Sequence, residues 1–495
     1  MFNLTIKNQK LTRLRRVKGG CMKKYLVFLI LPSLILAIWD RDTITVNKWR
    51  CPFYNDGRWG IDIGTTRDVA GGYWPYPLRN FYIFGGGPWI GCIAQGETLV
   101  TYGYNPNSGA TEMVPTLCQY WHQGYSNPLD RIYKYPGDWP PPSDRFPMAP
   151  IIPLSDMDLW CCFSDSDPSY HDTNDTRPIG IDIALTVYGF NDFTAQDFFF
   201  LKYDLININN YLINDMYFGI VLDGDIGDAT DELTGLILNK LFSIGSDTIR
   251  VKNSGLIYDY DNIETPRTEW EGGTPGAVAI RLLSAPFGLN LSAFKKFPIE
   301  SDPVNDRQRY LAMAGYNWYQ IPPQYVPFDS IDYNGGDKRF IMSCGPFNLL
   351  PCSTATFYYA VIGSPHGDSG EVGSKHDTTS LAQRCYWAEM VFMERLGIEE
   401  KEQSTLKVSH STLEIYPNPA KSVIRVRCPL SGKEPANLKI FDVSGKLIGE
   451  VSTSKSAKEH NEEIRISLKG IKPGIYFCQL KGEKYKAIRK LVIIE

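Results

Sequence analysis

Apolar and polar residues alternate along several stretches of the chain between residues 151 and 365. The clearest is GIDIALTVYGF, in which apolar residues occupy every second position from Ile181 to Val187. This period of two is typical of a β-strand with one buried face. FFFLKYDLININN, MYFGIVLDGD, residues 331–347 and TATFYYAVI continue the strand pattern. Strands that follow one another without helical crossovers predict a mostly β protein with an antiparallel β-sandwich body.

One late helix is predicted to close this body. Ser380 and Gln383 have capping-box spacing, in which the serine side chain caps the first helical turn. Apolar residues then recur at helical spacing as far as Phe392, and Gly397 supplies a C-terminal stop. We therefore predict a β-sandwich body over residues 151–398 that ends in a helix.

Residues 39–150 differ in composition, because glycine, proline and aromatic residues crowd together there. This density of turn-forming residues predicts a β region of short strands and long surface loops. Two segments, WPYP at 74–77 and DWPPP at 138–142, hold tryptophans among prolines. They have two interpretations: binding platforms for a ligand, or aromatic rings packed tightly against proline.

The N-terminal region carries the pattern of an export signal. Lys23 and Lys24 precede the uncharged apolar run YLVFLILPSLILAI. Its 14 residues fall short of the roughly 20 that a membrane-spanning helix needs. The run matches a secretory signal peptide, which we predict over residues 22–38. The alternatives are a buried helix and a short anchor.

Residues 1–21 fit poorly in front of such a signal. The codons for Lys18-Gly19-Gly20 can resemble a bacterial ribosome-binding site at a suitable distance from Met22. We therefore expect translation to begin at Met22.

The C-terminal tail consists of short strand-like runs separated by tight turns. It contains LEIYPNPAKSVIRVR, KIFDVSGKLIGE and GIKPGIYFCQLKGEKYKAIRKLVIIE. Asn418-Pro419, Ser444-Gly445 and Lys472-Pro473-Gly474 break the pattern. We predict a small Ig-like β-sandwich of about seven or eight strands over residues 413–495. The polar stretch 399–412 predicts a linker.

Three motifs in this tail resemble the C-terminal sorting domain of bacterial type IX secretion substrates. They are YPNPA at 416–420, the Asp442-x-x-Gly445 turn, and PGIY at 473–476 before a basic terminal strand. The resemblance implies export to the periplasm and then passage across the outer membrane by the type IX secretion machinery. The body, including GYWPYPLRNFYIFGGGPWIG, is similar to large uncharacterised cargo proteins with this tail. That similarity implies no activity.

Composition and charge narrow the classes of function. Of the 495 residues, 43% are hydrophobic and 21% are charged, as in ordinary soluble globular proteins. The net charge of −4 conceals an acidic body, because residues 25–410 hold 27 basic and 46 acidic residues. Such a body repels phosphate, so we expect no nucleic-acid partner. We also expect no transmembrane segment in the mature protein.

The cysteines permit disulfides in an exported chain. Cys344 and Cys352 flank a candidate hairpin, and Cys428 and Cys478 form a second candidate pair in the tail. The adjacent pair Cys161-Cys162 points to opposite sides of a strand, so we expect buried thiols there. No His/Cys spacing indicates zinc.

The acidic run DGDIGDATDE is a candidate cation site. Its carboxylates are Asp223, Asp225, Asp228, Asp231 and Glu232, and two glycines permit tight curvature between them. Calcium takes about 6–8 oxygen ligands of this kind. The sequence therefore predicts calcium at the end of the YFGIVL strand. The alternative is a solvated acidic loop.

Two patterns bear on enzymatic activity. Residues 367–370 spell the GDSG of trypsin-like serine proteases, but neither His122 nor His171 has the sequence context of a catalytic histidine. A polar loop is the preferred interpretation. Glycoside hydrolases need two carboxylates roughly 5–10 Å apart, and no local motif pairs them. The sequence therefore identifies no catalytic residue.

Together these features predict a secreted or cell-surface protein whose body is structural, adhesive or ligand-binding. A surface glycan is the candidate partner of the body, and calcium is the candidate cofactor. The alternative is a secreted hydrolase, a glycosidase or a peptidase, with unrecognised catalytic residues.

Overall fold

A computed structural model of the chain describes residues 39–494, except for 65–66, 173–174, 176, 245–246, 299–300, 331, 367–378, 398–413, 419, 429–436, 443–446, 453–461 and 482–485. The predicted signal peptide, the expected start at Met22, the predicted linker and the GDSG motif lie outside the described residues. The chain divides into two compact units, residues 1–388 and 389–495.

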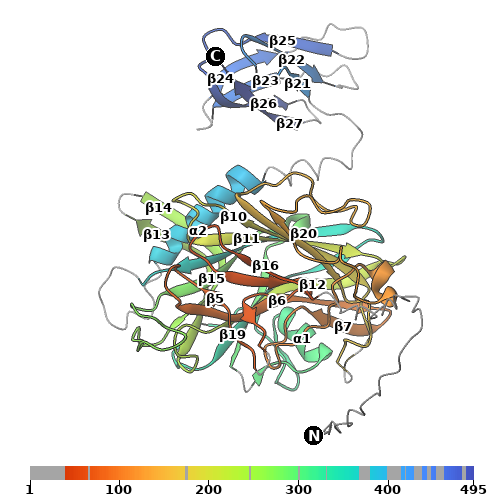
Figure 1. The fold of residues 1–495 in the computed structure, drawn as a ribbon, viewed down its shortest axis with the longest axis vertical. Helices are drawn as coiled ribbons and strands as arrows, with labels where there is room; N and C mark the ends of the chain where they lie inside the picture. The colour runs from red at the N-terminus through yellow and green to blue at the C-terminus, as the bar shows by residue number, and fades with distance from the viewer. Residues whose placement is uncertain are drawn as a thin grey trace, which may run out of the picture. The chain divides into compact units, whose positions relative to one another are not determined.

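Two large antiparallel sheets form the first unit (Figure 1). The eight-stranded sheet has the order β13 (Glu232–Ile244), β14 (Asp247–Asp259), β15 (Ala277–Ser284), β20 (Thr354–Ser364), β11 (Phe198–Asn207), β10 (Ile181–Gly189), β9 (Met157–Ser164) and β8 (Tyr133–Tyr135). The six-stranded sheet has the order β16 (Leu291–Pro298), β19 (Lys338–Leu349), β12 (Ile213–Gly224), β6 (Phe81–Ala94) and β5 (Gly72–Tyr73), with β7 (Glu97–Tyr102) paired to β6. The predicted mostly β, antiparallel body is confirmed.

Short strand pairs complete this unit. They are β1 (Arg41–Ile44) with β2 (Cys51–Tyr54), β3 (Ile61–Asp62) with β4 (Val69–Ala70), and β17 (Tyr316–Asn317) with β18 (Gln324–Tyr325). Two of the three pairs come from residues 39–150, where short strands were predicted. The same region also forms β6, a largely buried strand of 14 residues that its glycine- and proline-rich composition did not predict.

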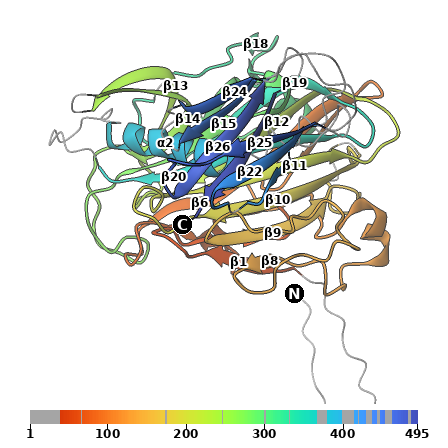
Figure 2. The same cartoon turned by 90° about the horizontal axis from the view of Figure 1, so that it is seen from above.

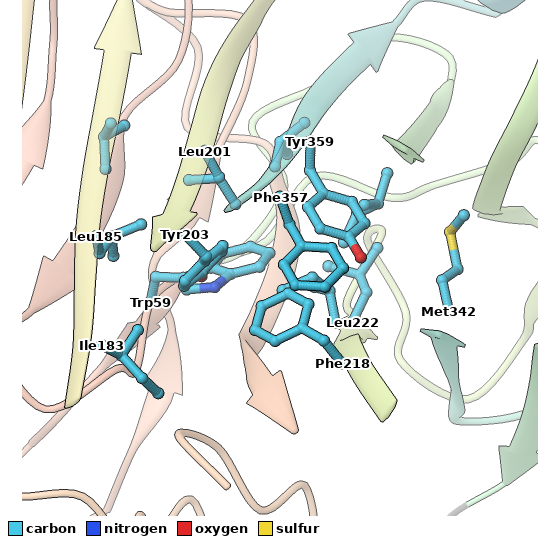
Figure 3. Close-up of a cluster of buried hydrophobic side chains, with 14 of the residues drawn as sticks. Trp59, Ile183, Leu185, Leu201, Tyr203, Phe218, Leu222, Met342, Phe357 and Tyr359 are labelled. Carbon is cyan, nitrogen blue, oxygen red and sulfur yellow. The ribbon is translucent and has the colours of Figure 1, made fainter. Parts of the chain in front are cut away.

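The main core lies between the two large sheets. Phe218 on β12 stacks on Phe357 on β20, with ring centroids 4.4 Å apart and planes inclined by 18° (Figure 3). Tyr203 on β11 approaches Phe218 at 5.4 Å. All three side chains are fully buried. Aromatic side chains bury about 150–250 Å² each, so these contacts contribute strongly to holding the two sheets together.

Strand β10 differs from its prediction, because both of its faces are buried. Its alternating residues, Ile181 to Val187, face the main core as predicted. The opposite face, represented by Ala184, packs in a second cluster with Phe146 and Trp160. Figure 2 shows β9, β10 and β11 side by side. The strand therefore lies inside the sheet and is covered on its second face by residues 117–149.

Two α-helices occur in the described residues. The predicted helix is α2 (Thr379–Val391), and one π-helical segment (Phe392–Leu396) continues it. Helix α1 (Asp306–Met313) was not predicted, because its sequence DRQRYLAM is short and largely polar. Short 3-10 helices span Cys118–Gln123 and Pro286–Gly288. No described helix has both the length and the apolar character needed to cross a membrane.

The second unit contains a three-stranded and a four-stranded antiparallel sheet. The strands are β21 (Glu414–Tyr416), β22 (Val423–Cys428) and β25 (Glu462–Ser467) in the first, and β24 (Leu447–Ser452), β23 (Asn437–Asp442), β26 (Gly474–Lys481) and β27 (Lys486–Ile493) in the second. Buried apolar residues of both sheets, including Val426 and Ile440, form one core. This is the predicted small β-sandwich.

The nine cysteines whose side chains the structure describes are free thiols. The side chain of Cys428 lies outside the described part of the chain. The candidate disulfide between Cys344 and Cys352 is wrong, because Cys344 is buried inside β19 beside the Tyr359 hydroxyl, whereas Cys352 is exposed in the following turn. Cys478 is free and buried as a small core residue of the tail. The prediction of buried thiols at Cys161-Cys162 is confirmed.

Candidate functional site

The predicted acidic run lies where the chain passes from the six-stranded to the eight-stranded sheet. It begins at the end of β12 and finishes at the first residue of β13 (Figure 1). The structure places its five carboxylates in four different surroundings.

Asp223 is buried and belongs to an ion pair. Its carboxylate accepts hydrogen bonds from Nε of Arg339 at 2.9 Å and from the Tyr104 hydroxyl at 2.7 Å. Burial raises the pKa of Asp223 to about 6, and the positive charge of Arg339 opposes that rise. Both oxygens are engaged, so this carboxylate has little left to offer a metal ion.

Asp225 and Glu232 share a second environment, in which both carboxyl groups are largely removed from water. Burial raises the pKa of Asp225 to about 8, and the nearby charge of Asp223 adds to the rise. Burial and the proximity of Asp225 likewise hold the pKa of Glu232 well above its usual range. Oε1 of Glu232 accepts a hydrogen bond from the backbone N–H of Ile226 at 3.2 Å. Both carboxyl groups favour their neutral form, which is the weaker cation ligand.

Asp228 occupies a third, half-exposed position. Hydrogen bonds from Thr230 and Arg267 keep the pKa of Asp228 below its usual value. The Thr230 hydroxyl donates to it at 2.6 Å, and Nη1 of Arg267 donates at 3.1 Å. Asp228 is therefore a charged carboxylate with polar partners of its own.

Asp231 belongs to a cluster with Asp259 and Glu264. Each of the three offers a carboxylate oxygen, and these oxygens lie within 4.8 Å of one another. Burial raises the pKa of Asp231 to about 6 and that of Asp259 to about 7, and the charges within the cluster add to both shifts. The three carboxylates thus repel one another in a partly desolvated position.

Local hydrogen bonds hold this cluster in place. Oδ1 of Asp259 accepts the backbone N–H groups of Asp261 and Asn262. Glu264 accepts the backbone N–H of Asp228 and lies 3.4 Å from Nη2 of Arg267. Across the described residues, Oδ2 of Asp259 and Oδ1 of Asp231 are buried atoms without a hydrogen-bond partner.

Asp259 and Glu264 were not predicted from the sequence. The segment DYDNIE at 259–264 holds three carboxylates in six residues, which is the same signal that singled out the acidic run. What joins the two segments is the β13–β14 hairpin, whose register places Glu232 opposite Asp259. The backbone N–H of Tyr260 then donates to the carbonyl of Asp231 at 3.0 Å.

A second candidate site is the hairpin formed by β17 and β18, which we call the tyrosine hairpin (residues 316–325). Tyr319, Ile321 and Tyr325 are 62%, 99% and 59% exposed. The rings of Tyr316 and Tyr325 lie 5.1 Å apart. Burial raises the pKa of Tyr217 to about 12, and the nearby Tyr325 hydroxyl contributes. Exposed and half-buried tyrosines therefore gather at one place on the body.

The base of the tyrosine hairpin is fixed by a buried lysine. Nζ of Lys295, with 1% of the side chain exposed, donates to Oδ1 of Asn317 at 2.7 Å and to the carbonyl of Val326 at 2.9 Å. It also forms an ion pair with Asp329. Trp318 packs edge-on against Phe297 at 5.6 Å. The exposed rings thus stand on an ordered support.

The two aromatic segments singled out in the sequence are packed differently. Trp74 of WPYP is 3% exposed and lies in the main core. Trp139 of DWPPP packs against the second cluster, and its indole N–H donates to the carbonyl of Ile151 at 3.1 Å. Tyr76 is half-exposed, with the Arg50 guanidinium 3.7 Å from its ring centroid. Trp74 is therefore not available as a binding platform, whereas Trp139 is only half-buried.

Residues 414–494 match the family model of the secretion system C-terminal sorting domain. This segment is a type IX secretion sorting domain. The protein is accordingly secreted or carried on the outer cell surface, and its tail interacts with the type IX secretion machinery. The match covers the second sandwich and leaves the activity of the body open.

Three solved structures are similar to parts of the chain. A polysaccharide lyase has 7% identity and a TM-score of 0.24, over 92% of this chain and 46% of the lyase. Dimeric latent PorU from Porphyromonas gingivalis has 11% identity and a TM-score of 0.15, over 56% of this chain and 31% of PorU. A β-glucuronidase from Faecalibacterium prausnitzii has 9% identity and a TM-score of 0.14, over 53% of this chain and 46% of the glucuronidase. The chain spans less than half of the length of each. Similarity this low supports no conclusion about activity. No curated protein matches the chain.

Proposed function

We propose that the body is an adhesive or ligand-binding module that the sorting domain delivers to the cell surface, and that it binds a neutral glycan through the tyrosine hairpin. The observation that carries this proposal is the exposure of Tyr319, Ile321 and Tyr325 together on one hairpin. Large exposed apolar side chains that gather in one place are typical of interaction sites.

Tyrosine is suited to a sugar ligand for a chemical reason. Its ring offers an apolar face to the C–H groups of a sugar ring, and its hydroxyl exchanges hydrogen bonds with sugar hydroxyls. The acidic body, with 46 acidic against 27 basic residues over 25–410, repels polyanions. These properties together favour a neutral glycan.

The ordered base of the hairpin supports binding as well. Lys295 and Trp318 hold the two ends of the loop in the body. A surface already fixed in its binding conformation loses less conformational entropy when a ligand arrives. The support beneath the rings therefore favours a recognition role.

A secreted hydrolase is the second candidate, and the pair Asp225 and Glu232 favours it. Carboxyl groups with raised pKa values serve as general acids in such enzymes. Glu232, however, has no exposed surface, so a substrate has no direct access to it. The binding function is therefore the better supported of the two.

The test applies the full secreted protein to a glycan array and to generic glycosidase and peptidase substrates. We expect selective retention of neutral glycans and no turnover of any substrate. Turnover that disappears in Glu232→Gln would establish the hydrolase instead. Absence of binding to any glycan would remove the proposal.

A further inference from the structure

We propose that Asp231, Asp259 and Glu264 form a calcium site that joins the start of β13 to the segment following β14. The site shares only Asp231 with the five ligands that the acidic run suggested. It is independent of the glycan-binding proposal, because it uses different residues.

The spacing of the three carboxylates suits a single ion. Their oxygens all lie within 4.8 Å of one another. Calcium binds oxygen at about 2.3–2.6 Å, so two ligands on opposite sides of the ion are about 4.6–5.2 Å apart. One calcium ion can therefore contact all three carboxylates without a large movement of the backbone.

Two buried carboxylate oxygens of the cluster have no hydrogen-bond partner among the described residues. Asp259 is 0% exposed, and its Oδ2 has no hydrogen-bond partner among the described residues. Oδ1 of the same carboxylate is occupied by two backbone N–H groups. Oδ1 of Asp231 is also buried and unpartnered within the described part of the chain. A buried acceptor without a hydrogen-bond partner destabilises the folded state, and a bound cation would satisfy both oxygens.

The neighbouring arginine does not balance the charge of the cluster. Arg267 lies 3.1 Å from Asp228 and 3.4 Å from Glu264, so it serves two carboxylates. No lysine, arginine or histidine of the described residues forms a salt bridge with Asp231 or Asp259. A divalent ion would supply the missing positive charge.

The donor set selects the kind of metal. All three ligands are carboxylates, with no histidine or cysteine in the cluster, and hard oxygen donors favour calcium or magnesium over zinc or copper. Magnesium requires tighter, near-octahedral geometry at about 2.0–2.1 Å. The protein is secreted or lies on the outer cell surface. Extracellular modules bind calcium with Kd values of about 10⁻⁴–10⁻³ M, so a site of modest affinity is sufficient there.

The experiment measures calcium binding by the full secreted protein after chelator treatment. Isothermal titration with calcium chloride should show one bound ion, and thermal unfolding should shift to higher temperature when calcium is added, because the ion binds only the folded state. Magnesium chloride, titrated in parallel, should bind more weakly. No calcium heat and an unchanged melting temperature would overturn the proposal.

Matched variants locate the site. Asp259→Asn keeps Oδ1 for the two backbone N–H groups but removes a charge, so it should weaken calcium binding by at least about tenfold. Without calcium, its melting temperature should equal or exceed that of the wild type, because repulsion falls. Asp225→Asn, a change in the acidic run outside the cluster, should bind calcium like the wild type. The reverse order, with Asp225→Asn impaired and Asp259→Asn unaffected, would contradict this assignment.

Discussion

Asp223 and Arg339 face each other across the neighbouring strands β12 and β19, and Nε of Arg339 donates to the Asp223 carboxylate at 2.9 Å. Their side chains are 2% and 6% exposed. Arg339 also pairs with Asp302 at 3.2 Å. One arginine thus compensates buried carboxylates at the point where the acidic run begins.

This relationship predicts that Arg339→Met destabilises the body strongly. The substitution leaves Asp223 buried without its cationic partner, which costs about 3–5 kcal/mol. The free energy of unfolding, measured by urea denaturation, checks this value. Arg177→Met is the control, because the pair of Arg177 with Glu97 is exposed at 39% and 52% and contributes at most about 1 kcal/mol. Equal losses in the two variants would contradict the role of Arg339.

Glu112 gives a prediction on pH. Its side chain is fully buried, Oε1 accepts the backbone N–H of Asp172 at 3.0 Å, and Nδ1 of His171 lies 3.6 Å from Oε2. Burial raises the pKa of Glu112 to about 8. Because the folded state holds this proton more tightly than the unfolded state, the stabilisation is complete below the ordinary pKa of 4.5 and is lost as pH rises toward about 8.

Glu112→Gln should remove this contribution, because glutamine resembles the protonated acid. The unfolding free energy of the wild type should fall relative to the variant between pH 5 and 8, by at most about 1.4 kcal/mol per pH unit for one proton. Urea denaturation of both proteins at several pH values measures the difference. A difference that stays constant with pH would show that Glu112 titrates normally.

Deletion of residues 413–495 should leave the body in the periplasm, because the sorting domain is what the type IX machinery engages. Cell fractionation with an antibody to the body measures the distribution. As a control, the same tail fused to a reporter with its own signal peptide should reach the surface. Surface display of the deleted protein at the wild-type level would be incompatible with this assignment.

Most of the fold could be predicted because it follows local patterns. Alternation from Ile181 to Val187 marked a core-facing strand, and three turn motifs marked the tail sandwich. Burial of the second face of β10 was not predictable, since it depends on residues 117–149 folding over it. Helix α1 was missed because a short polar helix has no apolar stripe to reveal it.

The candidate sites were predictable only in part, because they depend on pairing between distant segments. Asp231 stood out in the sequence, but its neighbour Asp259 is brought to it by the β13–β14 register. The partner of Asp223 is Arg339, more than a hundred residues away. The sequence did not indicate the tyrosine hairpin as a site, because the exposure of Tyr325 cannot be predicted from composition.

The glycan-binding role of the tyrosine hairpin is the central claim, and its most direct test is a binding titration of the polysaccharide selected by the array. The wild-type protein is compared with Tyr325→Ala and with Phe193→Ala, a 76% exposed aromatic outside the hairpin. We predict that Tyr325→Ala weakens binding about tenfold, equal to about 1.4 kcal/mol, and that Phe193→Ala binds like the wild type. Equal affinity of Tyr325→Ala and the wild type, or an equal loss in both variants, would contradict the account.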